Sequence, residues 1–201
     1  MPEHPPLPFR VTIARPERPV SAWRARRAEE ALVRAAQAGS GEAFEELFAR
    51  HWPAAHRAAW LVVHDSAAAE DVAQEALVAS LRALHRFDRR RPFGPWLHRI
   101  VVNRAIDHVR ARDARREVAA DGLPEAVAPA GGNAAGDSEV IRALARLGPE
   151  QRAVVVLRHL LGYTPGEIAQ LLELPRGTVN SRLRRALDGL GALLGEPDAP
   201  S

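Results

Sequence analysis

Residues 117–137 most constrain the fold, because large apolar side chains do not recur at any regular spacing within this stretch. Its small residues, prolines and glycines are typical of a flexible linker. On both sides of it, apolar residues recur at helical spacing, and no strand-like alternation appears. We therefore predict an all-α protein in which two small helical domains, residues 21–116 and 138–195, are joined by the flexible linker 117–137. The proline-rich residues 1–20 are expected to be a disordered extension, and residues 196–201 a short tail.

Composition excludes several classes of protein. The chain has no cysteine, which rules out disulfides, thiolate metal sites and a cysteine nucleophile. No apolar run reaches the ~18 residues of a membrane helix, and the N-terminus lacks the apolar core of a signal peptide, so we expect a cytoplasmic protein. His51 and His56 would diverge by roughly 140° on a helix, and no nucleophile–base pair or phosphate-binding loop is present. We predict neither enzymatic activity nor a metal or cofactor.

Charge is distributed very unevenly along the chain. The formal net charge is only +3, but residues 82–116 carry eleven arginines and three acids, and residues 41–81 carry two arginines and seven acids. All basic side chains are arginine, since the chain has no lysine. An acidic block directly before a basic block suggests two partners of opposite charge.

The basic block contains a helix with a mixed polar and aromatic face. Pro95 suits the first turn of a helix, and Trp96, Arg99, Asn103, Asp107 and Arg110 then follow at steps of three or four residues. Such residues share one face of a helix. Arginine neutralises phosphate, an indole ring stacks on a base, and an asparagine amide can contact a base edge. The face therefore fits an unstacked nucleic-acid strand, or else a solvated basic surface with Trp96 as a core anchor.

The acidic block contains a helix whose polar residues point outward. Asp65 or Ser66 can cap this helix. Its apolar positions leave Asp71, Gln74, Glu75 and Val78 on the opposite side. This face is either a binding surface or an acidic surface that serves solubility alone.

The C-terminal part carries the sharpest local signal. Thr164 and Glu167 form a capping box with a proline between them, and they open a helix of about two turns. A turn at Glu173–Pro175 leads into a longer amphipathic helix, which makes a helix-turn-helix. The exposed side of the second helix can contact phosphates and major-groove base edges. An ordinary helical hairpin with a solvated arginine face is the alternative.

Two stretches together resemble the bacterial RNA polymerase sigma factors of the extracytoplasmic-function (ECF) subfamily. The first joins AEDVAQEAL, residues 69–77, to RFDRRRPFGPWLHRIVVNRAIDHVR, residues 86–110. The second is LGPEQRAVVVLRHLLGYTPGEIAQLLELPRGTVNSRLRRAL, residues 147–187. They stand in the order of the second and fourth conserved regions of the family. The resemblance implies a sigma factor that binds core RNA polymerase, directs it to promoters and melts the minus-ten region.

The resemblance assigns a role to each of three surfaces. The side chains that would bind the clamp helices of the largest polymerase subunit are Asp71, Gln74 and Glu75. Those that would open the minus-ten element and hold the melted non-template strand are Arg86, Arg89, Arg90, Arg91, Phe93, Trp96, Arg99, Asn103 and Arg110. Those that would read the duplex minus-thirty-five element are Arg176, Thr178, Asn180, Ser181, Arg182, Arg184 and Arg185. An anti-sigma factor is a further partner that the resemblance allows, whereas no membrane contact is expected.

Two residues depart from the family pattern. Glu173 stands where glycine is usual in the turn, so either a left-handed backbone there is strained or the turn is of another type. Asn180 replaces a common basic residue and could contact adenine rather than guanine or phosphate. The competing interpretation is a helix-turn-helix regulator that does not bind core polymerase. It would require a sensor or receiver domain, for which the first half shows no strand-like pattern.

Overall fold

The computed structural model describes residues 20–119 and 135–195, and every regular element in these two ranges is helical, which confirms the all-α prediction. The first half contains α1 (Val20–Gln37), α2 (Gly41–Val63), α3 (Ser66–Ala83), the 3₁₀ turn η1 (Leu84–Arg86) and α4 (Phe93–Ala119). The second half contains α5 (Ala135–Ala145), α6 (Pro149–Val155), the π-helical turn η2 (Val156–Leu160), α7 (Pro165–Leu172) and α8 (Arg176–Gly195).

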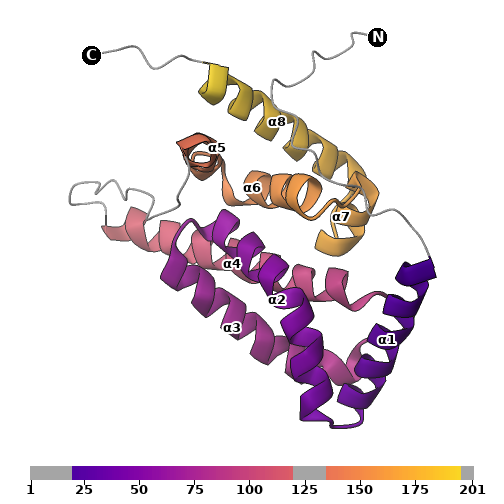
Figure 1. Ribbon diagram of the computed structural model, residues 1–201. Helices are drawn as coiled ribbons and strands as arrows, with labels where there is room; N and C mark the ends of the chain where they lie inside the picture. Colours follow the sequence, from indigo (N-terminus) through magenta and orange to yellow (C-terminus); the bar gives the residue numbers. More distant parts are fainter. Residues whose placement is uncertain (1–19, 120–134, 196–201) are drawn as a thin grey trace.

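Helices α2, α3 and α4 form the body of the first half (Figure 1), where each helix contacts the other two. Their starts follow the expected capping chemistry. Ser40 Oγ accepts a hydrogen bond from Ala43 N at 3.2 Å, and Asp65 Oδ1 accepts one from Ala68 N at 2.8 Å. Each bond satisfies a backbone N–H that the first turn of a helix would leave unpaired. Asp65, rather than Ser66, is therefore the cap of α3.

Helix α1 braces the start of α4. Glu29 Oε1 accepts a hydrogen bond from Phe93 N at 3.0 Å, and Glu29 Oε2 lies 3.0 Å from His51 Nε2. A Cβ on Gly94 would lie only 3.0 Å from the His51 ring, so glycine is what allows this approach. The Gln37 amide donates to the carbonyls of Leu84 and Phe87, both at 2.9 Å. These bonds fix the segment that leads from α3 into α4.

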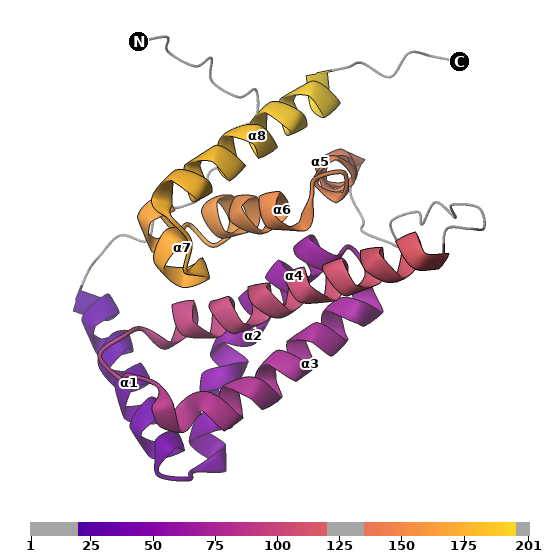
Figure 2. The same ribbon diagram turned by 180° about the vertical axis from the view of Figure 1, so that it is seen from behind.

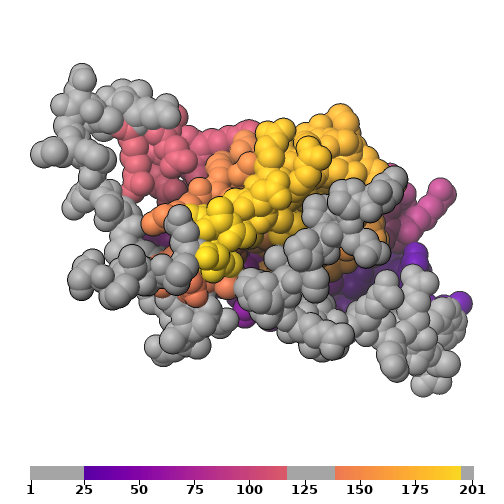
Figure 3. Space-filling model, turned by 90° about the horizontal axis from the view of Figure 1, so that it is seen from above, coloured from indigo at the N-terminus to yellow at the C-terminus, as the bar shows by residue number. Residues whose placement is uncertain are grey.

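The second half is built around α6, which packs against α8, while α7 and α8 form the predicted helix-turn-helix. The capping box at Thr164 and Glu167 is present in full, with Pro165 at the first helical position. Glu173 ends α7 in the left-handed region, at φ 55° and ψ 43°. The strained alternative considered for this position is therefore the one the chain adopts. Figure 3 shows α8 running along one face of the molecule.

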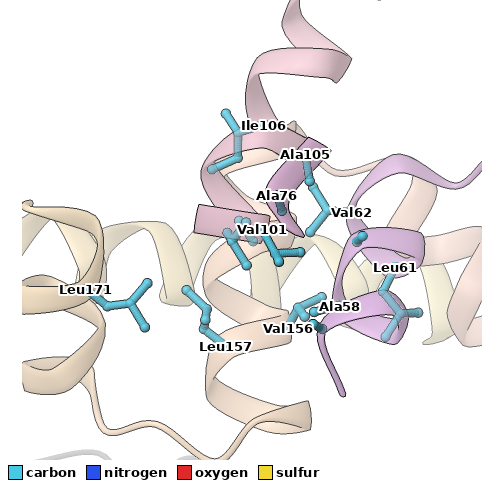
Figure 4. Close-up of a cluster of buried hydrophobic side chains, with 14 of the residues drawn as sticks. Ala58, Leu61, Val62, Ala76, Val101, Ala105, Ile106, Val156, Leu157 and Leu171 are labelled. Carbon is cyan, nitrogen blue, oxygen red and sulfur yellow. The ribbon is translucent and has the colours of Figure 1, made fainter. Parts of the chain in front are cut away.

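The two halves pack against each other through one continuous core. In Figure 2, α6 and α7 lie along α4, and α6 also contacts α2. Figure 4 shows Val156 and Leu157 of the second half among Ala58, Val62 and Val101 of the first. All five side chains are buried. The core therefore belongs to both halves.

The bounds of the predicted linker are partly wrong. Helix α4 continues to Ala119 and α5 begins at Ala135, so residues 117–119 and 135–137 are helical. The rest of the linker, residues 120–134, lies outside the described residues, as do residues 1–19 of the predicted extension 1–20 and the tail at 196–201, whereas Val20 is the first residue of α1. Independent behaviour of the two domains stays a prediction.

Candidate nucleic-acid interface

The basic loop before α4 is fully accessible. Arg86, Arg89, Arg90 and Arg91 are all exposed. Asp88 holds the loop in a tight turn, because its carboxylate accepts from Arg90 N at 3.0 Å and its carbonyl accepts from Arg91 N at 2.9 Å. This turn leaves all four arginines exposed.

The two aromatic residues predicted to contact DNA differ in accessibility. Phe93 is 0% exposed and belongs to the core, so its ring has no face for a base; its prediction as a DNA contact is corrected to a packing role. Trp96 is half-buried, with its ring 4.8 Å from Phe87 and 5.3 Å from Phe93 between centroids. Trp96 thus packs against the core, and because it keeps some exposed surface, its contact with a base stays a prediction.

The polar residues that follow Trp96 on α4 face the second half of the chain. Arg99 Nη2 forms an ion pair with Glu173 Oε1 at 2.6 Å. Arg110 Nε donates to Glu150 Oε1 at 2.8 Å. A cleft of about 310 Å³ lies beside the Arg110–Glu150 pair; its lining residues are Asn103, Ile106, Asp107, Arg110, Glu150, Leu172, Leu174 and Arg182. We call Arg99, Asn103 and Arg110 the α4 stripe. The structure places the three stripe residues on one side of α4, where the two arginines pair with carboxylates of the same chain.

The pKa of Glu150 is lowered in this arrangement. Burial alone would raise it, but hydrogen bonds from its own backbone N–H and from Arg110 outweigh burial. Glu150 is therefore a carboxylate at neutral pH, and its attraction to Arg110 is present under ordinary conditions.

The outward face of α3 is as predicted. Asp71, Gln74 and Glu75 are exposed. Beside them, Val78 and Leu81 are 45% and 54% exposed, the large hydrophobic residues that stand out on the surface of the described residues. Leu81 follows Gln74 and Val78 at steps of four and three residues, so it lies on the same outward face of α3. An acidic face with an apolar edge suits a protein partner better than solvent.

Helix α8 divides the predicted DNA-reading residues into two groups. Arg176, Asn180, Arg184 and Arg185 are exposed, whereas Thr178, Ser181 and Arg182 are half-buried. Ser181 Oγ donates to Thr178 O at 2.9 Å, and Arg182 lines the cleft beside α4. The exposed group alone forms an open basic surface in this structure.

Several residues that define this region gave no sequence signal. His98 Nδ1 lies 2.7 Å from the Tyr163 hydroxyl across the two halves. Burial raises the pKa of Tyr163 and lowers the pKa of His98 to about 4, so a protonated hydroxyl lies against a neutral ring at neutral pH. Glu150, Glu173 and these two residues are distant in sequence from their partners, and no local periodicity reveals such pairs.

Comparisons with known proteins match both halves. A model of the Sigma-70 region 2 family matches residues 47–115, and a model of the Sigma-70 region 4 family matches residues 137–188. The chain thus has the two conserved regions of a sigma factor, in the order found in that class.

Two relatives identify the subfamily of sigma factors to which the chain belongs. The chain is 37% identical over 172 residues to the ECF RNA polymerase sigma factor SigM of Mycobacterium tuberculosis (strain ATCC 25618 / H37Rv), covering 84% of this chain and 86% of the relative. It is 33% identical over 164 residues to the RNA polymerase sigma factor CarQ of Myxococcus xanthus, covering 79% and 92%. The chain belongs to the ECF sigma factors, as its sequence motifs indicated.

A solved structure supports the fold. The structure of CnrH in complex with the cytosolic domain of CnrY has a TM-score of 0.63 and 34% identity, over 84% of this chain and 97% of that one. A search of the described helices for a long apolar segment found none capable of crossing a membrane.

Proposed function

We propose that this sigma factor binds core RNA polymerase through α3, opens the minus-ten element with the basic loop and the α4 stripe, and reads the minus-thirty-five element with α8. The observation that carries the proposal is the segregation of an acidic face on α3, a basic loop before α4 and an arginine face on α8. Each surface lies on a different element and can therefore act on a different partner.

The α3 surface combines charge with apolar area. Asp71 and Glu75 provide negative charge for steering and orientation, and exposed Val78 and Leu81 provide area whose burial favours association. The polymerase clamp helices are the partner that family membership supports for this surface.

The basic loop and the α4 stripe suit melted DNA. Arginines of the loop would neutralise phosphates, the exposed part of Trp96 would stack on a base, and the Asn103 amide would contact a base edge. Phe93 is left out of this surface because it is buried. Its role is to hold the Trp96 ring in place.

The α8 surface suits duplex DNA. Asn180, Arg184 and Arg185 are exposed on a helix that follows a tight turn, which is the arrangement that places a recognition helix in a major groove. The half-buried Thr178, Ser181 and Arg182 are expected to contribute through phosphate contacts once the cleft beside α4 opens.

The test separates opening from recruitment. Arg185→Ala is expected to weaken recruitment to a promoter by about 1–3 kcal/mol if the side chain contacts a base. Asn103→Ala should leave recruitment near normal and block opening, because Asn103 contributes only once bases leave the stack. Binding and abortive transcription are measured with reconstituted holoenzyme. A template with an unpaired minus-ten bubble should rescue Asn103→Ala but not Arg185→Ala, since the cost of unstacking is already met.

Equal rescue of both variants, or of neither, would contradict this division of roles. Normal transcription with no binding to core polymerase would instead favour the helix-turn-helix regulator. We further propose that the protein acts in the cytoplasm, where polymerase and promoters are found, and that it has no catalytic activity or cofactor of its own.

An anti-sigma protein is a further proposed partner. CnrH, whose structure is similar, was solved with the cytosolic domain of CnrY. Co-purification of the chain from its native cells, followed by a direct binding measurement with each recovered protein, tests this proposal.

A further inference from the structure

The second half of the chain places a carboxylate on each of the two arginines of the α4 stripe. Glu173 pairs with Arg99 at 2.6 Å, and Glu150 accepts from Arg110 at 2.8 Å. Arginine binds carboxylate and phosphate through the same fork of N–H donors. Each acid therefore takes the place that a DNA phosphate would need.

Glu173 is an unexpected residue for its position. Its φ of 55° is in the left-handed region, and the only other non-glycine residue there in the described chain is His64. Glycine adopts this conformation without a steric cost. The turn itself requires only the backbone, since Leu174 N donates to Ala169 O at 2.9 Å. A glutamate accepts strain that glycine would avoid, and what it adds is a carboxylate that reaches Arg99.

The halves are also held together away from the stripe. Arg152 of α6 is 4% exposed and donates to Val62 O of α2. The same guanidinium donates to the carbonyls of Leu144, at 2.9 Å, and of Ala145 and Leu147, both at 2.8 Å. With the shared core, this arrangement keeps Glu150 and Glu173 beside α4. Asn103 lines the cleft together with Arg110 and Glu150, so the second half lies against the middle of the stripe as well as pairing with its two arginines.

We propose that the second half is a built-in inhibitor of minus-ten binding. Glu150 and Glu173 occupy Arg110 and Arg99 in the free protein, and they must leave before the stripe can bind single-stranded DNA. This inference rests on the proposed function of the stripe. It also assigns a purpose to Glu173: it is a latch that a glycine could not provide.

The first experiment uses a pair of variants matched in charge. Glu150→Gln with Glu173→Gln removes both carboxylates from the latch. Glu139→Gln with Asp188→Asn removes two exposed acids of the same half, so it controls for the change in net charge. The probe is a short fluorescent single-stranded DNA of random sequence at fixed salt, because binding to phosphates depends on salt. The latch variant should bind about 3- to 10-fold more tightly than the control, the range expected for two exposed ion pairs.

The second experiment measures closure without DNA. The chain has no cysteine, so Ala67→Cys on α3 and Ala192→Cys on α8, both exposed, provide two unique label positions. Glu173→Arg and Arg99→Glu should each increase the share of molecules with a longer label distance. The two substitutions combined should restore the original distance, because the ion pair forms again with its charges exchanged.

The outcomes separate the latch from the function it rests on. The proposal would be overturned if neither single substitution changed the label distance. It would also be overturned if the latch variant and its control bound the DNA with equal affinity. Adding Asn103→Ala to the latch variant should weaken DNA binding again. If Asn103→Ala does not weaken DNA binding while the label distances change as expected, the contact between the halves is real but the stripe does not bind DNA. In that case the proposed inhibition of minus-ten binding is also wrong.

Discussion

Arg152 is a buried residue that connects the second half to α2 of the first. It is a buried cation, and no carboxylate appears among its hydrogen-bond acceptors; four carbonyls take that place. Carbonyls at the C-terminal end of a helix carry partial negative charge, and those of Val62 and Leu144 lie at the ends of α2 and α5. Burial, and then the charge of Arg112, lower the pKa of Arg152 to about 10. It stays charged at neutral pH.

Removing the Arg152 guanidinium should lower the free energy of unfolding. Arg152→Met leaves several buried carbonyls unpaired at about 1 kcal/mol or more each, so we expect a loss of about 3 kcal/mol in the free energy of unfolding. Arg152→Lys should lose less than this, because an ammonium donates from a single atom and cannot reach all four carbonyls. Urea denaturation measures both. A methionine variant within 1 kcal/mol of the parent would show that the carbonyls find other partners.

Two buried histidines should make stability depend on pH. Burial, followed by the charges of Arg152 and Arg112, lowers the pKa of His64 to about 3, and burial and His51 lower that of His98 to about 4. Between pH 6.5 and these values the unfolded chain binds more protons than the folded one. Stability should therefore fall as the pH falls, by about 1.4 kcal/mol per pH unit for each histidine.

His64→Asn is the variant that tests this prediction. His64 has φ 57°, a conformation that asparagine tolerates well. In urea denaturation, the free energy of unfolding of the variant should fall less between pH 6.5 and 5 than that of the parent. The difference should equal the contribution of one histidine. Parallel curves for parent and variant would exclude His64 as the titrating group.

At the scale of elements, local chemistry was predictable and distant pairing was not. The capping box of α7, the cap at Asp65 and the outward face of α3 follow from residues within one or two turns of each other, and the structure confirms all three. Phe93 was assigned to DNA by the resemblance alone, and its packing could not be read from nearby residues, because Glu29 and His51, which hold it in the core, are distant in sequence. The partners of the α4 stripe lie 40 residues or more away in sequence, beyond any periodic signal.

The α3 surface yields a prediction about polymerase binding. Asp71→Ala with Glu75→Ala should weaken binding to core polymerase by ~1–3 kcal/mol, the size of an important interface contact. The free energy of unfolding should change by less than ~0.5 kcal/mol, because both side chains are exposed. Glu45→Ala with Glu46→Ala, on the exposed side of α2, is the control with the same change in charge. Equal affinities of the two double variants for core enzyme would remove α3 from the interface.

At the scale of the whole molecule, the question is whether the two halves act as separate modules or as one body. The sequence suggested two domains, because the apolar pattern stops at 117–137. The structure joins them through buried residues of both halves, among them Val62, Val101 and Leu157. Neither half alone shows that its apolar surface extends beyond its own core. In the proposed function the α4 stripe binds melted DNA, and in this closed body its two arginines are paired with carboxylates of the second half.

Cutting the chain between the halves tests how strongly they hold each other. A specific protease site placed between Ala119 and Ala135 turns closure from an intramolecular step into a bimolecular one. In the uncut chain, a linker of this length supplies an effective concentration of roughly millimolar. The cut halves should therefore still elute together at concentrations approaching that value and separate on dilution. Arg152→Met should shift the separation to higher concentration, because the hydrogen bond to Val62 of the other half is lost. Halves that elute separately even near millimolar concentration would mean that the intact chain is mostly open, and the stripe would then need no release.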